Sequence, residues 1–200
     1  MSQPIPLQHG QFYHIYNRGS NRQDIFVEGR NYRYFLRLYA KHIEPLAETY
    51  ACCLLPNHFH FLVRIKDIEG LTGLEDLSGL KKPSQSFSNL FNAYSKAFNK
   101  AYDQTGSLFQ RPFGRIPVTS DAYFTWLIAY VHQNPQKHGL VADFRTWTYS
   151  SYQALLSTRP TRLPRDEVLT WFDGTTGFRD FHRQEIPGRR IAPLIADDFN

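Results

Sequence analysis

Glu-Thr-Tyr-Ala-Cys-Cys-Leu-Leu-Pro-Asn-His-Phe-His-Phe-Leu-Val-Arg-Ile, residues 48–65, contains two apolar runs separated by Pro56-Asn57. Because proline cannot donate a hydrogen bond to a neighbouring strand, Pro56-Asn57 marks a turn or a strand edge. The flanking runs, 48–55 and 58–65, have the length and composition of strands. Two strands joined by so short a link indicate an antiparallel hairpin.

The sequence on either side of this hairpin predicts further strands and helices. The predicted helices carry apolar residues at helical spacing, and glycine, proline or charged residues separate them. In chain order we expect a strand at 10–17, a helix with a basic face at 29–43, a loop at 67–83 and a helix at 84–102 with Ser84 as N-cap. A short strand follows within 106–118, and then a helix at 121–133 that Asp121 caps and that stops at Asn134-Pro135.

This order of elements predicts the fold class. Helices gathered against a small antiparallel sheet are typical of an α+β protein close to the ferredoxin-like or RRM-like layout. We therefore expect a ferredoxin-like/RRM-like antiparallel sheet with the helices packed on one face. Short pieces that contain Trp and Tyr follow Gly139, and a Pro/Arg stretch occupies 159–165. We expect this part to form a C-terminal extension.

Composition narrows the class of protein. The chain has 200 residues, of which 42% are hydrophobic and 20% charged, values typical of a folded globular protein. The net charge of +5 favours an acidic partner such as nucleic acid or a membrane surface. Aromatic residues make up 16% of the chain, which is enough to suggest bases stacked on rings. We find no apolar run long enough to cross a membrane and no signal peptide at the start.

The two cysteines, Cys52 and Cys53, are adjacent in the chain. Neighbouring cysteines rarely form an unstrained disulfide, and their spacing does not suit a zinc site. We expect both to be small buried residues of a strand. Free thiols of this kind suit a reducing compartment, so we expect a cytoplasmic protein.

The clearest chemical pattern is Asn57-His58-Phe59-His60. Residues i and i+2 of a strand point to the same face, so His58 and His60 project side by side, as two imidazoles that share a metal ion should. Two ordinary strand histidines would show the same pattern. Their position in an apolar strand favours a ligand role, because unpaired polar groups are costly there.

The last predicted helix offers further site residues. Tyr130 and Asn134 are four residues apart and share a helix face, while Phe124, Ile128 and Val131 form an apolar stripe that can seat the helix on the sheet. Asn134 could give its amide oxygen to a metal, and Tyr130 could aim its hydroxyl at a phosphate. This donor set suits Mg²⁺ or Mn²⁺ better than a closed zinc site. His132 faces elsewhere and is structural or contacts DNA.

Several of these motifs resemble one known family. Leu-Leu-Pro-Asn-His-Phe-His-Phe-Leu-Val at 54–63 looks like the HUH motif, His-hydrophobic-His, of single-tyrosine (IS200-like) transposases. Ala-Tyr-Val-His-Gln-Asn-Pro at 129–135 resembles their nucleophile helix. Residues 13–19, 106–113 and 147–152 are also similar to that family. The resemblance covers residues 8–155, and the nearest branch is the REP-associated tyrosine transposases.

This resemblance implies an activity and a division of the chain. It implies a transposase domain at 8–145, followed by the C-terminal extension at 146–200. The enzyme would be a metal-dependent endonuclease and strand transferase that cleaves single-stranded DNA beside a hairpin. Tyr130 matches the nucleophile that forms a 5′-phosphotyrosine, His58 and His60 match the metal ligands, and Asn134 takes the place of a third ligand that is often Gln.

Basic residues are the candidates for contacts with DNA phosphates. Some of them are expected to be only solvated surface charges. The candidates are Arg18, Arg22, Arg111, Arg115, Lys81 and Lys82, with Arg30 and Arg33 as further possibilities.

Two rival functions remain open on the residues alone. One is a non-catalytic nucleic-acid-binding module on an RRM-like sheet, and the other is a different metal hydrolase in which Tyr130 only packs. The oligomeric state is also open, because simple members of the family are dimers with shared active sites, while the REP-associated branch tends to be monomeric.

Overall fold

A four-stranded antiparallel sheet forms the centre of the computed structural model, which describes residues 5–67, 83–188 and 192. The strand order is β2-β3-β1-β4, and every neighbouring pair is antiparallel. The predicted α+β class with a ferredoxin-like sheet is therefore confirmed. The strands are β1 (Phe12–Arg18), β2 (Ala47–Leu55), β3 (His58–Ile65) and β4 (Gly114–Val118).

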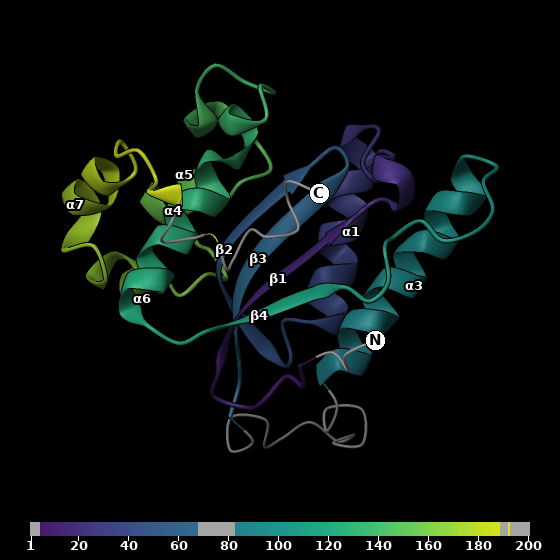
Figure 1. Ribbon diagram of the computed structural model, residues 1–200, viewed down its shortest axis with the longest axis horizontal. Helices are drawn as coiled ribbons and strands as arrows, with labels where there is room; N and C mark the ends of the chain where they lie inside the picture. Colours follow the sequence, from purple (N-terminus) through teal and green to yellow (C-terminus); the bar gives the residue numbers. More distant parts are fainter. Residues whose placement is uncertain (1–4, 68–82, 189–191, 193–200) are drawn as a thin grey trace.

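Helices α1 (Gly29–His42) and α3 (Pro83–Ala101) cover one face of this sheet (Figure 1). Their aromatic residues pack with the sheet in one apolar cluster; Phe35, for example, is fully buried and lies 5.2 Å from the ring of Phe59. Both helices are amphipathic, with charged residues on the outer side. Among the described residues, no helix combines the length and the apolar character needed to cross a membrane.

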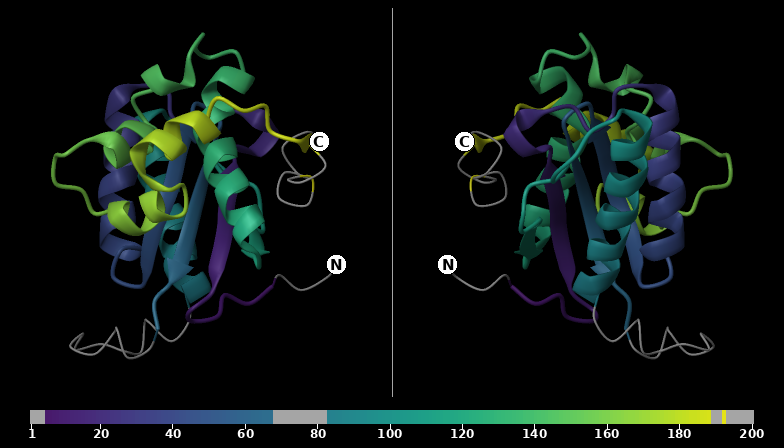
Figure 2. Two further views of the ribbon diagram at one scale, coloured as in Figure 1. Left: turned by 90° about the vertical axis from the view of Figure 1, so that its left-hand side faces the viewer. Right: turned by 90° about the vertical axis from the view of Figure 1, so that its right-hand side faces the viewer.

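Helix α4 (Asp121–Lys137) packs on the opposite face, so the expectation that all helices share one face is wrong. Figure 2 shows the sheet between the two helical layers. The reason lies in the strands, because β2 and β3 are buried on both sides and each side needs an apolar cover. The predicted stripe of Phe124, Ile128 and Val131 contributes to the apolar cluster on this face, together with Tyr50 and Leu62.

Most predicted element boundaries hold within two residues, but Ser84 lies inside α3, and Ser120, instead of Asp121, caps α4. Helix α4 also continues to Lys137 instead of stopping at residue 133. Pro135 has no N–H, so the last turn loses only one hydrogen bond there. Hydrogen bonds from residues that follow Pro135 then close the turn. Gly139, at φ 70°, donates to the carbonyl of Gln136 at 3.0 Å, and Leu140 donates to that of Pro135 at 2.9 Å. This is the Schellman ending of a helix, which satisfies its last carbonyl groups.

The rest of the chain packs on α4 and along β2. Leu54 N–H donates to the Tyr149 carbonyl, and Ser151 N–H donates to the Cys52 carbonyl, both at 2.9 Å. The apolar cluster of α4 also contains apolar residues from Phe144 onward to Phe178, so it includes residues on both sides of the predicted domain boundary at 145/146. That boundary stays a prediction. The short elements are η1 (Ser20–Arg22), η3 (Phe144–Thr146), α5 (Tyr152–Leu156), α6 (Arg165–Thr170) and α7 (Gly174–Phe181).

Both cysteines are free thiols, as the sequence predicts, with Cys53 buried and Cys52 half-buried.

Candidate active site

The sheet brings a row of polar side chains to the face covered by α4. His58 and His60 alternate with the apolar Phe59, which points to the other face. In the pairing of β1 with β3, Tyr16 lies opposite His60 and Arg18 opposite His58. Strand pairing therefore adds residues of β1 to the two predicted histidines.

His58 is held by its neighbour and faces α4. Its Nδ1 lies 2.6 Å from Asn57 Oδ1, and since an amide oxygen only accepts, Nδ1 carries the proton. The electron pair on Nε2 then faces Asn134 Oδ1 at 3.4 Å. Burial, aided by the nearby His138, lowers the pKa of His58 to about 3, so the ring is neutral near pH 7.

The contact between His58 and Asn134 lacks a proton, which makes it suitable for a cation. Asn134 is fully buried, and its Nδ2 has no hydrogen-bond partner among the described residues. Turning the amide over would pair Nδ2 with His58 and leave the oxygen without a partner. A divalent ion bound to both His58 Nε2 and Asn134 Oδ1 would replace the unfavourable contact between two electron pairs with two favourable ones.

His60 is oriented by His14, a residue that the sequence did not single out. The Nδ1 of His60 lies 2.9 Å from His14 Nε2, and the two rings are stacked with centroids 5.1 Å apart. His60 is fully buried, and burial lowers its pKa well below the usual value. A second residue that holds a histidine ring in this way is common around metal ligands.

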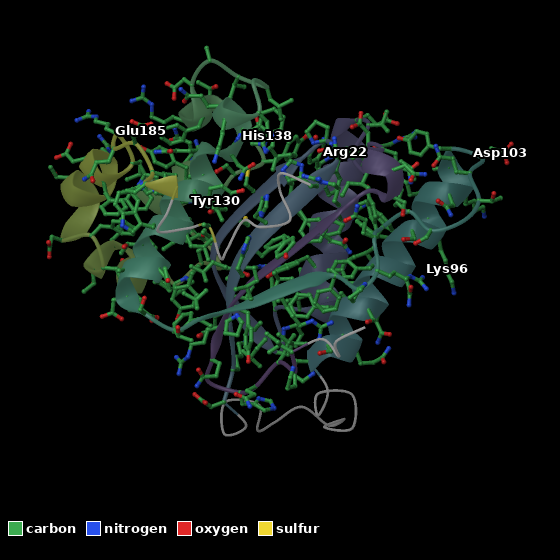
Figure 3. The ribbon with its side chains drawn as sticks, in the orientation of Figure 1. Arg22, Lys96, Asp103, Tyr130, His138 and Glu185 are labelled. Carbon is green, nitrogen blue, oxygen red and sulfur yellow. The ribbon has the colours of Figure 1, made fainter. Side chains whose placement is uncertain are left out.

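Tyr130 reaches the histidines from α4 of the same chain. Its ring centre lies 5.6 Å from that of His60, at an interplanar angle of 78°. The Nζ atom of Lys137 lies 5.1 Å from the centre of the Tyr130 ring. Figure 3 labels Tyr130, which lies on α4, and His138, the first residue after that helix. Tyr130 is only 1% exposed, so its side chain meets the site and not bulk solvent.

His132 lies on a different side of α4 from Tyr130 and has a structural environment. It is fully buried, and its ring nitrogens contact His182 Nε2 at 2.8 Å and Ser151 Oγ at 2.7 Å. The prediction that His132 faces away from the site therefore agrees with its position. Its two partners belong to the C-terminal part of the chain.

A cavity of about 50 Å³ opens beside the histidines, with Arg18 and Gln110 among its lining residues. It has room for a few water molecules but not for a nucleotide. The ring of Tyr16 forms part of its wall and lies against Gly114, where a Cβ atom would meet the ring at 2.1 Å. A ligand as large as a nucleotide could therefore enter only if side chains around this cavity moved.

The predicted DNA-binding residues are not equally placed. Arg18 lines the cavity, whereas Arg22, the last residue of η1, and Arg111, in the segment before β4, are exposed (Arg22 is labelled in Figure 3). Arg115 is half-buried, lies 3.9 Å from the centre of the Phe113 ring and donates to Ser84 Oγ at 2.7 Å, so its guanidinium is already engaged. Lys81 and Lys82 lie outside the described residues.

The donors at this site are two imidazoles and one amide. Among the described residues, no group of three or more His, Cys, Asp or Glu side chains forms a metal-binding cluster. The set of His58, His60 and Asn134 is a mixed nitrogen and oxygen set, which fits an ion that keeps open positions for a phosphate.

Comparisons with known proteins agree with this architecture. No family model matches the chain. A protein of Haemophilus influenzae, whose name assigns it provisionally to the REP-associated tyrosine transposases, is 30% identical over 108 residues, which are 52% of this chain and 58% of that protein. The chain thus spans less than two thirds of this relative.

A solved structure of a REP-associated tyrosine transposase bound to a REP hairpin has a similar fold. Its TM-score is 0.56 at 18% sequence identity, and the match covers 80% of this chain and 88% of the other. Over about half of its length the chain is therefore similar in sequence to a protein named for the REP-associated tyrosine transposases, and it shares the fold of the solved structure, in agreement with the predicted resemblance.

Proposed function

We propose that this chain cleaves and rejoins single-stranded DNA beside a hairpin, with Tyr130 as nucleophile. The observation that carries the proposal is that the Tyr130 ring lies against His60, with ring centres 5.6 Å apart, while Asn134 of the same helix faces His58. The relative's name and the hairpin-bound neighbour support the same class of substrate and reaction.

In the proposed reaction, the phenolic oxygen of Tyr130 attacks the phosphorus of a phosphodiester. A bond forms between that oxygen and phosphorus, while the bond from phosphorus to the 3′ oxygen of the preceding nucleotide breaks. The phenolic proton leaves, and the 3′ oxygen takes up a proton. The products are a 5′-phosphotyrosine and a free 3′-hydroxyl, and the reverse reaction rejoins the strand.

Lys137 assists Tyr130 in this proposal. A tyrosine hydroxyl normally titrates near pH 10, so attack near neutral pH needs a neighbour that favours the phenolate. The ammonium group of Lys137, 5.1 Å from the ring centre, provides a positive charge on that side.

His58, His60 and Asn134 would hold the divalent ion, Mg²⁺ or Mn²⁺. When bound, such an ion polarises a non-bridging oxygen of the phosphate and orients it. The protein's own part is to keep both imidazoles neutral through burial and to fix their rings through Asn57 and His14. Arg18, which lines the adjacent cavity, would bind a phosphate oxygen of the same strand.

A denaturing gel tests this proposal. The substrate is a labelled oligonucleotide with a hairpin and single-stranded flanks, taken from the DNA on either side of the protein's own gene, with Mg²⁺ or Mn²⁺. We expect a covalent protein–DNA adduct from the wild type, none from Tyr130→Phe or His58→Ala, and wild-type yield from Tyr123→Phe, a matched change on the same helix. DNA binding without any adduct would favour the non-catalytic module, and cleavage by Tyr130→Phe would favour a different hydrolase.

A further inference from the structure

A second, larger cavity lies between α4 and the C-terminal part of the chain. Its volume is about 920 Å³, in the range of small-ligand sites. Residues of α4, of the segment 142–156 and of the segment 179–186 line it, and it shares no lining residue with the cavity beside His58. Glu185, which is labelled in Figure 3, is one of the residues that line this cavity.

The lining of this cavity suits an anion. It contains four cationic side chains, Lys137, Arg145, Arg179 and Arg183, against the two carboxylates of Asp143 and Glu185. Asp143 pairs with Arg145 at 2.7 Å, and Arg183 pairs with Asp180, which is not a lining residue, at 2.8 Å, so Lys137 and Arg179 supply the remaining positive charge. The excess of positive charge favours a ligand that carries phosphate groups.

Three glutamines in the lining are fixed at one end of their amides by the backbone. Gln133 Nε2 donates to the His182 carbonyl at 2.8 Å, and Gln153 Nε2 donates to the Arg145 carbonyl at 3.0 Å. Gln136 Oε1 accepts from the Phe144 N–H at 3.1 Å. The opposite ends of these amides, two oxygens and one NH₂ group, have no partner within the part of the chain that the structure describes. Orientated amides of this kind recognise the edges of nucleobases.

Lys137 connects this cavity with the candidate active site. It lines the cavity, and its Nζ lies 5.1 Å from the centre of the Tyr130 ring. A strand whose phosphate lies at Tyr130 would therefore meet the positive charge of Lys137 on its way into the cavity.

We propose that this cavity binds the unpaired nucleotides next to the cleaved phosphate and reads their bases with Gln133, Gln136 and Gln153. This inference rests on the proposed function, because it takes the DNA strand at Tyr130 as its starting point. Phosphate groups pair with the cations at the rim, and base edges meet the free amide ends.

Fluorescence anisotropy tests the inference without any cleavage. One probe is a hairpin with a single-stranded tail from the DNA flanking the gene, the second is the same hairpin without a tail, and the third has abasic sites in the tail. The test variant is Gln153→Ala/Arg179→Ala. The control is Gln85→Ala/Lys96→Ala, which likewise removes one glutamine and one positive charge, here from the exposed side of α3, where Figure 3 labels Lys96.

We expect the test variant to lose affinity for the tailed hairpin by on the order of ten-fold, to lose less on the abasic probe, which keeps only the phosphates of the tail, and to bind the tail-less hairpin as the wild type does. The control should match the wild type on all three probes. Equal binding of the tailed hairpin by variant and wild type, an equal loss on every probe, or a wild type that does not distinguish the probes would overturn the inference. The gel described above judges the proposed function separately, since only it detects the Tyr130 adduct.

Discussion

A single glycine determines where the ring of Tyr16 lies beside the candidate site. Gly114 is paired with Tyr16 across β1 and β4, and the ring covers the place that a side chain at position 114 would occupy. Since Tyr16 lines the cavity with His58 and His60, a larger residue at 114 would change the site without touching a histidine.

Gly114→Ala should push the Tyr16 ring out of place and cost about 1–3 kcal/mol of unfolding free energy, as overpacking does. Urea unfolding measures the loss, and the adduct yield should fall with it. In a Tyr16→Ala background the same change should cost little, because the ring that it meets is gone. An equal cost in both backgrounds would show that this contact is not the cause.

Some residues of the candidate site can be predicted from the sequence, and others cannot. His58 and His60 can be predicted because the alternation of a strand puts residues i and i+2 on one face. The contact of His14 with His60 could not be predicted, because it depends on which strands pair and in which register. The direction of the Asn57 side chain is equally a property of the folded turn.

At the scale of elements, α4 is held on its outer side by a chain of buried hydrogen bonds. Cys52 N–H of β2 donates to Ser151 Oγ, Ser151 contacts His132, and His132 contacts His182, whose Nδ1 donates to the Phe178 carbonyl. This series of contacts joins the sheet, α4 and α7. The position of Tyr130 therefore depends on residues of the C-terminal part.

His182→Leu should destabilise the protein by about 1–3 kcal/mol, because it leaves a buried polar atom of His132 without its partner. Urea unfolding measures this change. The matched control is His42→Leu on the outer part of α1, which should change stability by less than about 0.5 kcal/mol. Equal effects of the two substitutions would contradict the structural role of the His132–His182 contact.

The positions of helices and strands can largely be predicted from the sequence. The face of the sheet that α4 covers and the residue at which α4 ends cannot. The periodicity of 29–43 and 84–102 appears in α1 and α3 almost unchanged. Pro135 predicts the end of the helix, whereas the hydrogen bonds from Gly139 and Leu140 that extend α4 have no local sequence pattern before the turn is formed. The face that α4 covers depends on the burial of both sides of β2 and β3.

At the scale of the whole molecule, buried histidines link stability to pH. Burial lowers the pKa of His182 to about 4, below its value of about 6.5 in an unfolded chain. Between these values the unfolded state binds a proton that the folded state does not, so stability falls as the pH decreases.

From pH 7 to pH 5 we expect His182 to contribute a loss of about 2 kcal/mol in unfolding free energy. Urea unfolding at both pH values measures it. His182→Gln, which cannot titrate, should lose less than the wild type by about that amount. A wild type that is as stable at pH 5 as at pH 7, or a variant with the same pH dependence, would contradict this assignment.

One chain brings together Tyr130 and the two histidines, so we expect each subunit to act alone. A mixture of Tyr130→Phe and His60→Ala should give no adduct, because neither chain has a complete site. The denaturing gel serves as the readout, and mixing either variant with wild type provides the positive control. Restored adduct formation in the mixture of the two variants would mean that sites are shared between subunits.

The most direct test of the proposed chemistry is to identify the residue that carries the DNA. After reaction with the tailed hairpin and Mn²⁺, nuclease digestion and peptide mass spectrometry locate the remaining nucleotide. We predict a 5′-phosphate ester on Tyr130 and on no other residue. A nucleotide on another tyrosine, such as Tyr16 or Tyr123, or a cleaved strand with no protein attached, would contradict the assignment of Tyr130 as nucleophile.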